Sequence, residues 1–329
     1  GWSITVAGEN LVSGENTYFA RAFDGAAWSD SSGTASTTGT VGIGFQPIAS
    51  VPDLHGRGPG GSVVYDGQFY VWGGEDDDGS PYSDALHIYD PDTDSWTEGA
   101  NWPVERSDST EFVLDGLLYA VGGEGPYAGS FKNQVHSYDP QTDTWTQRAD
   151  FPRAAWDRAG AVADGIAYVF SGRDGYGETE DTIWQYDVAV DSWSTVTSIP
   201  TSVREPGVVV QNSKIYSFGG QHRESESNGW EITDIQVYDP AADSWEVIGD
   251  MPVKWQGPDA LRFEDRVLLI DDVVYDEATD GWVENDQLWE FDPASGQWSS
   301  HALGAAVPSK VENNTGVIGD VLYLVGGNS

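Results

Sequence analysis

The sequence predicts an all-β fold built from a repeated four-stranded unit, and three residue patterns carry this prediction. Pairs of small residues recur with a period of about 50 residues, which is typical of a ring of β-blades. These pairs are Gly73-Gly74, Gly122-Gly123, Ser171-Gly172, Gly219-Gly220 and Gly326-Gly327. An aromatic residue followed by aspartate recurs at Tyr89-Asp90, Tyr138-Asp139, Tyr186-Asp187, Tyr238-Asp239 and Phe291-Asp292. Six residues beyond each of these aspartates stands a tryptophan, namely Trp96, Trp145, Trp193, Trp245 and Trp298.

Within each unit, alternating apolar residues predict short antiparallel strands. Asp-Gly pairs lie between the first two strand-like runs, at Asp66-Gly67, Asp115-Gly116 and Asp164-Gly165, and such pairs favour two-residue hairpin turns. A single four-stranded blade cannot bury both of its faces. We therefore expect neighbouring blades to stack around an axis and the ring to close.

The two ends of the repeat region complement each other. Phe45 precedes Pro52 by seven residues, the same interval that separates Trp96 from Pro103, so Phe45 occupies the tryptophan position of a further copy. Residues 316–327 supply the first half of a repeat. We expect six blades, the last of them closed by strands from both termini, with Phe45 and residues 46–50 as the N-terminal closing strand.

This combination of glycine pair, Tyr-Asp pair and tryptophan resembles the kelch repeat over residues 41–329. The resemblance implies a six-bladed kelch-type β-propeller, in which the glycine pair ends the second strand, the Tyr-Asp pair closes the third and the tryptophan opens the fourth. The fifth repeat departs from the pattern, since Asp271-Asp272 replaces the glycine pair and Leu268 replaces the second-strand tyrosine. We interpret this departure as sequence drift.

Residues 1–40 lack the repeat and are expected to form a short, separate β segment and linker. Residues 2–6 and 17–24 alternate like strands, and residues 21–25 resemble the end of a strand in immunoglobulin-like or fibronectin-like modules of surface proteins. Two or three strands cannot form a sandwich. We therefore expect the missing part to lie upstream, to be replaced by docking on the propeller, or to come from another chain, and the last case predicts self-assembly through these strands.

Composition excludes several classes of partner and site. The chain has 54 acidic and 15 basic residues and a net charge of −39, which argues against nucleic acid or an anionic membrane as partner. The abundance of aspartate and the shortage of lysine resemble the surfaces of halophile proteins; the alternative is an ordinary acidic secreted protein. The absence of cysteine excludes disulfides, thiolate metal sites and a cysteine nucleophile.

Targeting signals are absent from the sequence. The sequence has no apolar run of about 18 residues, which is the length that a membrane-spanning helix needs. The sequence begins Gly1-Trp2-Ser3 without a methionine or signal peptide. We expect a segment processed or excised from a longer chain.

Propellers often bind ligands at one mouth of the central channel, on loops that lead into the innermost strands. Seven basic or aromatic residues fall on this class of loop: Arg57, Arg106, Arg158, Arg204, Lys310, Trp156 and Trp255. If the cations converge, they form a basic collar suited to a carboxylate, sulfate or sialic-acid-like group, and the tryptophans stack on sugar. In the alternative interpretation, Glu105, Glu205 and Glu312 pair with the arginines and the collar is architectural.

Two acidic runs are candidate calcium ligands, because clustered carboxylates supply the oxygen atoms that this cation prefers. The candidates are Asp76, Asp77, Asp78, Asp271, Asp272 and Asp276. Neither run has the spacing of a known calcium loop. We expect no cofactor besides this structural calcium.

Signals of catalysis are weak. A copper oxidase of the galactose oxidase type would need a cysteine. Resemblance to sialic acid mutarotases would need an Arg and Glu constellation, which Arg57, Arg106, Glu105 and Glu205 could supply. The sequence contains no phosphate-binding glycine loop, no nucleophile elbow and no histidine pair at metal-binding spacing. We predict no catalytic residues.

Together these features predict an extracellular or cell-surface binding or structural propeller of a larger protein from a salt-adapted source. The expected partner is a protein or glycan at the cell surface. The alternative function is a carbohydrate-binding or carbohydrate-active propeller, similar to a sialic acid mutarotase, that acts through the basic collar. An intracellular adaptor is disfavoured by the acidity and by the lack of a companion helical segment.

Overall fold

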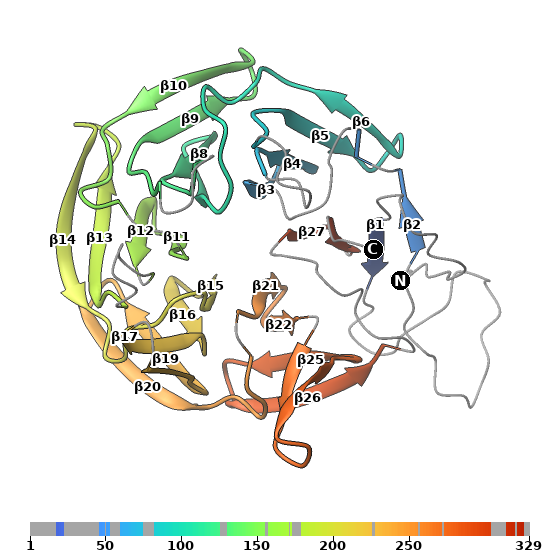
Figure 1. The fold of residues 1–329 in the computed structure, drawn as a ribbon, viewed down its shortest axis with the longest axis vertical. Helices are drawn as coiled ribbons and strands as arrows, with labels where there is room; N and C mark the ends of the chain where they lie inside the picture. Colours follow the sequence, from blue (N-terminus) through green and yellow to red (C-terminus); the bar gives the residue numbers. More distant parts are fainter. Residues whose placement is uncertain are drawn as a thin grey trace.

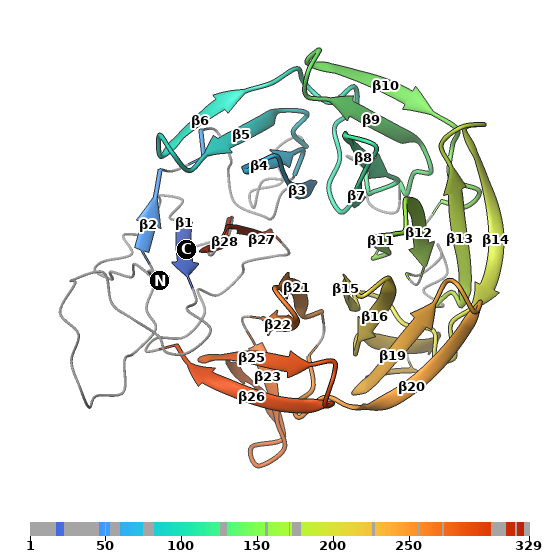
Figure 2. The ribbon, with the colours of Figure 1, turned by 180° about the vertical axis from the view of Figure 1, so that it is seen from behind.

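The structure is a computed structural model whose regular elements are all β-strands, arranged in a ring around a central axis (Figure 1; seen from behind in Figure 2). It describes residues 18–22, 46–49, 51–52, 60–74, 82–125, 130–154, 157–170, 172, 179–225, 228–255, 257–271, 273–303, 314–319 and 321–325. Among these residues there is no helix of the length and apolarity needed to cross a membrane.

Five four-stranded sheets each come from one contiguous repeat and are called blades 1 to 5. Blade 1 contains β3 (Gly61–Tyr65), β4 (Gln68–Trp72), β5 (Leu86–Asp90) and β6 (Ser95–Glu98). Blade 2 contains β7 (Thr110–Leu114), β8 (Leu117–Val121), β9 (Val135–Asp139) and β10 (Thr144–Arg148). Blade 3 contains β11 (Ala159–Ala163), β12 (Ile166–Phe170), β13 (Thr182–Asp187) and β14 (Ser192–Ser198).

Blades 4 and 5 each carry an additional two-stranded hairpin between their second and third strands. Blade 4 contains β15 (Gly207–Gln211), β16 (Lys214–Phe218), β19 (Asp234–Asp239) and β20 (Ser244–Asp250), with β17 (Gln221–Ser225) and β18 (Asn228–Glu231) as its hairpin. Blade 5 contains β21 (Asp259–Phe263), β22 (Arg266–Ile270), β25 (Gln287–Asp292) and β26 (Gln297–Ala302), with β23 (Val273–Asp276) and β24 (Gly281–Glu284) as its hairpin.

The Asp-Gly pairs form the predicted tight turns between first and second strands. In blade 1, Tyr65 pairs with Gln68 across a two-residue loop, and Asp66 and Gly67 have φ angles of 49° and 76°. Both angles lie in the left-handed region, which asparagine, aspartate and glycine tolerate best. The turn therefore matches the right-handed twist of the flanking strands.

A further four-stranded sheet joins the two ends of the described chain and is called the composite sheet. Its strand order is β2 (Gln46–Ile48), β1 (Tyr18–Ala22), β28 (Val321–Leu324) and β27 (Thr315–Ile318). The pairing of β1 with both β28 and β2 is antiparallel. Closure by strands from both ends, predicted from the sequence, is confirmed, with the outer strand formed by residues 46–48; Phe45 lies outside the described residues.

The position of Tyr18–Ala22 corrects one expectation. This stretch was assigned to an N-terminal immunoglobulin-like segment outside the propeller, with docking on the propeller as one of three alternatives, but it is an interior strand of the composite sheet, between β2 and β28. The C-terminal residues supply two strands of this sheet, β27 and β28, and residues 46–48 supply the outer strand β2. Tyr18–Ala22 supplies the fourth strand, which lies between β28 and β2. Because both edges of β1 are paired, this strand has no free edge for self-assembly. The other residues of the segment lie outside the described ones.

The hydrophobic core lies between neighbouring sheets rather than inside any one of them. Between blades 1 and 2, for example, Trp72 and Leu86 pack with Leu118 and Tyr138. The composite sheet packs in the same way on both sides. Leu322 and Leu324 join a buried cluster with blade 5, whose members are Phe263, Leu268, Ile270, Leu288 and Leu303, and Tyr323 joins a cluster with blade 1.

The tyrosine of the Tyr-Asp pair, an aspartate five residues after it and the repeat tryptophan form a hydrogen-bonded unit, here called the interblade clamp. In blade 1, Oδ1 of Asp94 accepts hydrogen bonds from the Tyr89 hydroxyl (2.9 Å) and from the Ala49 amide (2.8 Å). The indole Nε1 of Trp96 donates to the Ala49 carbonyl (2.7 Å). Blade 1 therefore holds both backbone groups of a residue in the segment that follows β2.

The clamp recurs along the chain. In blade 2, Asp143 and Trp145 bind the backbone of Ala100 at 2.6 and 2.8 Å. In blade 3, Asp191 and Trp193 bind Ala149 at 2.8 and 3.0 Å. Each clamped alanine follows the last strand of the preceding blade. The repeated sequence pattern is thus a set of contacts between blades.

Replacement of Asp94 by alanine is expected to lower the free energy of unfolding by about 2 kcal/mol or more. The substitution removes an acceptor shared by two hydrogen bonds, and it places alanine at φ 45°, in the left-handed region that aspartate tolerates better. Asp94→Asn keeps an acceptor and the left-handed propensity, so it should lose about 1 kcal/mol or less. Chemical denaturation of both variants measures the difference; equal losses would show that the clamp geometry is not what stabilises the closure.

Candidate functional site

The sequence analysis placed the candidate site at the channel mouth, and the structure describes four of its seven residues. Arg106, Arg158, Arg204 and Trp255 are described. Arg57, Trp156 and Lys310 lie outside the described residues, as does Glu312.

The loops at this mouth are joined to the ends of second strands by backbone pairing. In blade 2, Ser107 and Glu124 exchange amide-to-carbonyl hydrogen bonds of 3.0 and 2.9 Å. In blade 4, Arg204 and Gln221 do the same at 2.9 and 3.0 Å. In blade 5, the Tyr275 amide donates to the Lys254 carbonyl at 3.1 Å. The loops are therefore fixed by the blades that they lead into or leave.

Arg106 is buried within blade 2. Its guanidinium donates to the carbonyl of Gly122 at 3.0 Å and to the side-chain oxygen of Gln134, and it lies over the Trp102 ring. Burial lowers the pKa of Arg106 to about 10, so the group remains charged at neutral pH. Burial and the charge of Arg106 lower the pKa of the nearby His136 to about 4, which keeps that imidazole neutral.

Arg158 pairs with an acidic residue that the sequence analysis did not name. Its terminal nitrogen lies 2.7 Å from Oε2 of Glu180, and both side chains are almost fully buried. The other carboxylate oxygen of Glu180 lies 2.7 Å from the exposed Arg153. The guanidinium of Arg158 also lies 4.6 Å from the centre of the Phe151 ring. Burial lowers the pKa of Arg158, and the charge of Glu180 opposes that shift.

Arg204 lies in a chain of polar contacts that reaches the hairpin of blade 4. It pairs with Asp157 at 3.1 Å and with Glu205 at 3.4 Å. Its Nε donates to Oε1 of Gln221 at 2.8 Å, and Nε2 of Gln221 donates to Glu231 at 3.0 Å. All three described arginines of the collar are engaged by groups of the protein, as the architectural interpretation expected. Of the glutamates that it named as partners, Glu205 pairs with Arg204, whereas Arg158 pairs with Glu180 instead.

Trp255 corrects another expectation. It was expected to offer a sugar-stacking face, but its side chain is fully buried. It packs in the cluster shared by blades 4 and 5 and meets Trp289 edge to face, with ring centres 6.2 Å apart. Its side chain therefore fills space between the two blades instead of facing the channel mouth.

Only part of the calcium prediction falls on described residues. The carboxylate of Asp276 accepts hydrogen bonds from the Ala278 amide (3.0 Å) and the Thr279 hydroxyl (2.8 Å) within its own turn, and the Thr279 bond lowers its pKa. The carbonyl of Asp271 accepts from Asn285. Across the described part of the chain, no three acidic or histidine side chains form a metal-binding group. Asp76, Asp77, Asp78 and Asp272 lie outside it, and calcium there stays a prediction.

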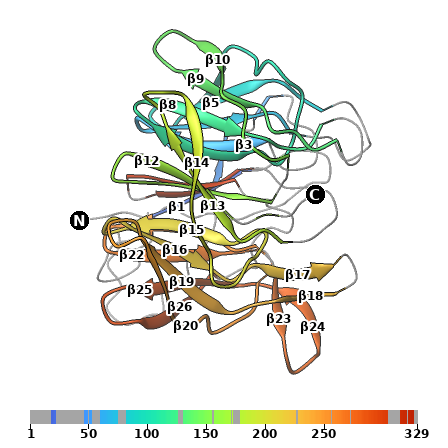
Figure 3. The same ribbon diagram turned by 90° about the vertical axis from the view of Figure 1, so that its left-hand side faces the viewer.

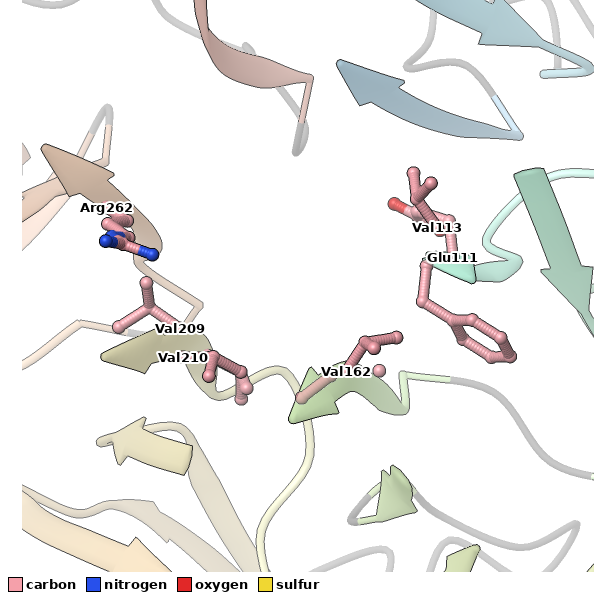
Figure 4. Close-up of a pocket in the computed structure, with 10 residues that line it drawn as sticks. Glu111, Val113, Val162, Val209, Val210 and Arg262 are labelled. Atoms are coloured by element: carbon pink, nitrogen blue, oxygen red, sulfur yellow. The ribbon is translucent and has the colours of Figure 1, made fainter. Parts of the chain in front are cut away.

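The inner strands line a pocket on the central axis that the sequence analysis did not identify (Figure 4). The pocket has a volume of about 260 Å³, and its lining is mainly valine, with Glu111 of β7 and Arg262 of β21 as charged members. Burial raises the pKa of Glu111, and Asp259 and Asp108 add to the shift. The signal in the sequence was that Glu111 is the one charged residue of the inner strand β7. The described lining offers no nucleophile and base pair.

The two hairpins of blades 4 and 5 project from the face that carries the channel-mouth loops (Figure 3). Trp230 on β18 is 45% exposed and Trp282 on β24 is 37% exposed. A signal for these hairpins exists in the sequence. The interval from the second residue of the glycine pair to the aromatic–Asp pair is 15 residues in the first repeat (Gly74 to Tyr89) and 18 in the fourth (Gly220 to Tyr238).

Replacement of Arg158 by methionine is expected to lower the free energy of unfolding by about 3 kcal/mol or more, because it leaves the buried carboxylate of Glu180 without its buried partner. Arg153→Met removes an exposed partner of the same carboxylate and should cost about 1 kcal/mol or less. Denaturant titration of the two variants measures the contrast. If Arg158 served a ligand and not the fold, both variants would lose little free energy of unfolding.

Comparison with known proteins agrees with this architecture. The family model described as the KLHDC2/KLHL20/DRC7 Kelch-repeats domain matches residues 60–275. The chain is 24% identical over 125 residues to beta-scruin of Limulus polyphemus, covering 38% of this chain and 13% of that protein. It is 26% identical over 155 residues to the kelch-like protein terF of Aspergillus terreus, covering 45% of this chain and 33% of that protein.

Further similarities point in the same direction. Kelch-like protein 35 of Mus musculus is 30% identical over 147 residues, which cover 44% of this chain and 22% of that protein. The matches thus span a third or less of the length of these relatives. A solved structure of YjhT superposes with a TM-score of 0.67 at 16% identity, covering 91% of this chain and 97% of that one, and so has the same fold. Because the family model covers more than half of the sequence, the chain belongs to the kelch-repeat family and folds as a kelch β-propeller.

Proposed function

We propose that this chain is a protein-binding propeller of a larger cell-surface protein, with the channel-mouth face and its two hairpins as the binding surface. One observation carries the proposal. The described arginines of the mouth are engaged within the protein, whereas Trp230 and Trp282 on the hairpins are exposed. Aromatic side chains are enriched among the residues that dominate protein interfaces.

The composite sheet acts in this proposal as a sixth blade that makes the ring a rigid support. Its packing against blade 5 and blade 1 favours this role. A rigid ring keeps the loops at its mouth in fixed relative positions, which lowers the entropy lost when a partner binds. Protein interaction is also the general role of kelch propellers, and a location outside the cell remains part of the proposal.

The carbohydrate alternative has less support. A sialic-acid site of the kind considered from the sequence requires arginines that point into open space. Arg158 pairs with Glu180 and Arg204 pairs with Asp157, and Trp255 has no exposed face. We therefore favour a protein partner.

Photo-crosslinking tests the binding surface. The chain is prepared with a photoreactive phenylalanine analogue at position 282 and is added to intact cells of the source organism. We expect it to crosslink to a partner protein on the cell surface, which protease added outside the cells digests. The same analogue at position 190, an exposed turn of blade 3, is the matched control. Equal yields from the two positions, or products that resist external protease, would contradict the proposed surface or its location.

A salt-adapted origin is also part of the proposal, and it predicts the response of stability to salt. With a net charge of −39, repulsion among carboxylates extends over about 10 Å in 0.1 M salt but over about 3 Å in 1 M salt. We expect the thermal unfolding midpoint to rise by about 10 °C or more between 0.1 and 2 M KCl, as followed by circular dichroism. A flat or falling midpoint would identify an ordinary acidic protein.

A further inference from the structure

We propose that the two hairpins, β17–β18 and β23–β24, form a site for a basic segment of a partner protein, whose arginine or lysine side chains lie on Trp230 and Trp282 and pair with the surrounding carboxylates. This inference rests on the proposed function, because it names the chemistry of the partner at the same face.

The hairpin of blade 4 is fixed at its base and presents Trp230. Gln221 at the start of β17 pairs with Glu231 at the end of β18 and is bound by Arg204. The neighbouring His222 lies opposite Trp230, with ring centres 5.0 Å apart. Nδ1 of His222 lies 2.6 Å from the Ser202 carbonyl, to which it donates. The imidazole therefore supports one side of the indole, while 45% of Trp230 stays exposed.

The hairpin of blade 5 presents Trp282 in a similar way. Trp282 lies opposite Tyr275, and the two rings meet edge to face with centres 5.5 Å apart. The Tyr275 hydroxyl donates to Asp280 in the turn of the same hairpin. The Lys254 backbone holds the base of the hairpin through the Tyr275 amide. Trp282 and its neighbour Val283 are each 37% exposed.

The two hairpins belong to neighbouring parts of the ring. They extend consecutive blades and project on the same side of the ring in Figure 3. Lys254, in the segment that joins blade 4 to blade 5, contacts the second hairpin through its backbone and through Glu277.

Exposure of these indoles is unusual in this molecule. Among the described side chains, the large apolar residues that are at least 37% exposed are Ile166, Val190, Trp230, Val247, Ile248, Trp282 and Val283. The two tryptophans in this set are both on the hairpins. Exposed tryptophans on the hairpins of two consecutive blades indicate an interaction site.

The charges around the tryptophans favour a cationic partner. The blade 5 hairpin carries Asp276, Glu277, Asp280 and Glu284, and Glu231 ends the blade 4 hairpin. Lys254 already pairs with Glu277 at 3.3 Å and lies 5.4 Å from the Tyr275 ring centre. That contact combines an ion pair with a cation–π interaction, the combination that an incoming arginine or lysine would repeat on Trp282. The overall charge of −39 would also speed the approach of a basic segment.

Titration with a defined peptide tests the proposal on the full chain. The probe is a fluorescein-labelled ten-residue peptide of alternating arginine and glycine, and its comparator carries neutral citrulline in place of arginine. We expect the arginine peptide to bind at least 10-fold more tightly by fluorescence anisotropy in 0.3 M KCl. We expect the double substitution Trp230→Ala and Trp282→Ala to weaken binding at least 10-fold. Ile166→Ala with Ile248→Ala, a matched loss of exposed apolar surface, should change it less than 2-fold.

Charge-matched variants separate a local site from general attraction. Glu277→Gln with Glu284→Gln removes two carboxylates at the hairpin and should weaken binding at least 5-fold. Asp92→Asn with Glu98→Gln removes the same charge from exposed positions of blade 1 and should have less than a 2-fold effect. Equal losses in the two pairs would overturn the proposal, because the peptide would then follow only the net charge.

A direct reporter covers the case in which a variant fails to fold. In protein labelled with 5-fluorotryptophan, the ¹⁹F resonances of Trp230 and Trp282 are assigned with Trp230→Phe and Trp282→Phe, and both should shift with the arginine peptide. Unmoved resonances would overturn the site, as would shifts caused by neutral chitohexaose and not by the peptide, which would identify a glycan surface. Position 282 crosslinking to protein while the peptide fails would leave the proposed function standing and reject a basic partner.

Discussion

The interblade clamp is the interaction on which the rest of the propeller depends. An aspartate fixed by a tyrosine hydroxyl accepts the amide of an alanine from the preceding segment, and a tryptophan donates to the carbonyl of that same alanine. Because both backbone groups of one residue are bound, the clamp fixes the angle between successive sheets at the junctions that lead into blades 1, 2 and 3. The apolar clusters between sheets then form against surfaces that are already positioned. In blade 1 the clamped residue is Ala49, so the contact that orders neighbouring blades also holds the N-terminal side of the closure.

The channel mouth follows from this arrangement. Its loops pair with the ends of second strands. Its described arginines form hydrogen bonds and ion pairs within the protein that fix those loops. The contact chain from Asp157 through Arg204 and Gln221 to Glu231 shows the outcome most clearly. A residue expected to meet a ligand instead fixes the base of a hairpin. The exposed tryptophans, Trp230 and Trp282, lie on the two hairpins, whose strands are additional to the four-stranded repeat.

The sequence predicted the fold well because two members of the clamp, the tyrosine and the tryptophan, recur at fixed spacing, as at Tyr89 and Trp96. It failed for Tyr18–Ala22, since the place of that strand depends on pairing with residues about 300 positions away and not on its own composition. The partner of Arg158 was missed for a related reason: Glu180 lies 22 residues further on, in a different loop. Trp255 looked like an exposed loop residue because spacing does not reveal the volume to be filled between two blades.

The antiparallel pairing of β1 with β28 has a mechanical consequence. Phe19, at the start of β1, is paired with Leu324, at the end of β28. The polypeptide leading into β1 and the polypeptide leaving β28 therefore emerge at the same end of the ladder. Tension applied through these two segments would load the hydrogen bonds one after another, as in peeling, and not together, as in shear. The composite sheet would then be the point at which the ring yields first to a pulling force, while the five contiguous blades stay folded.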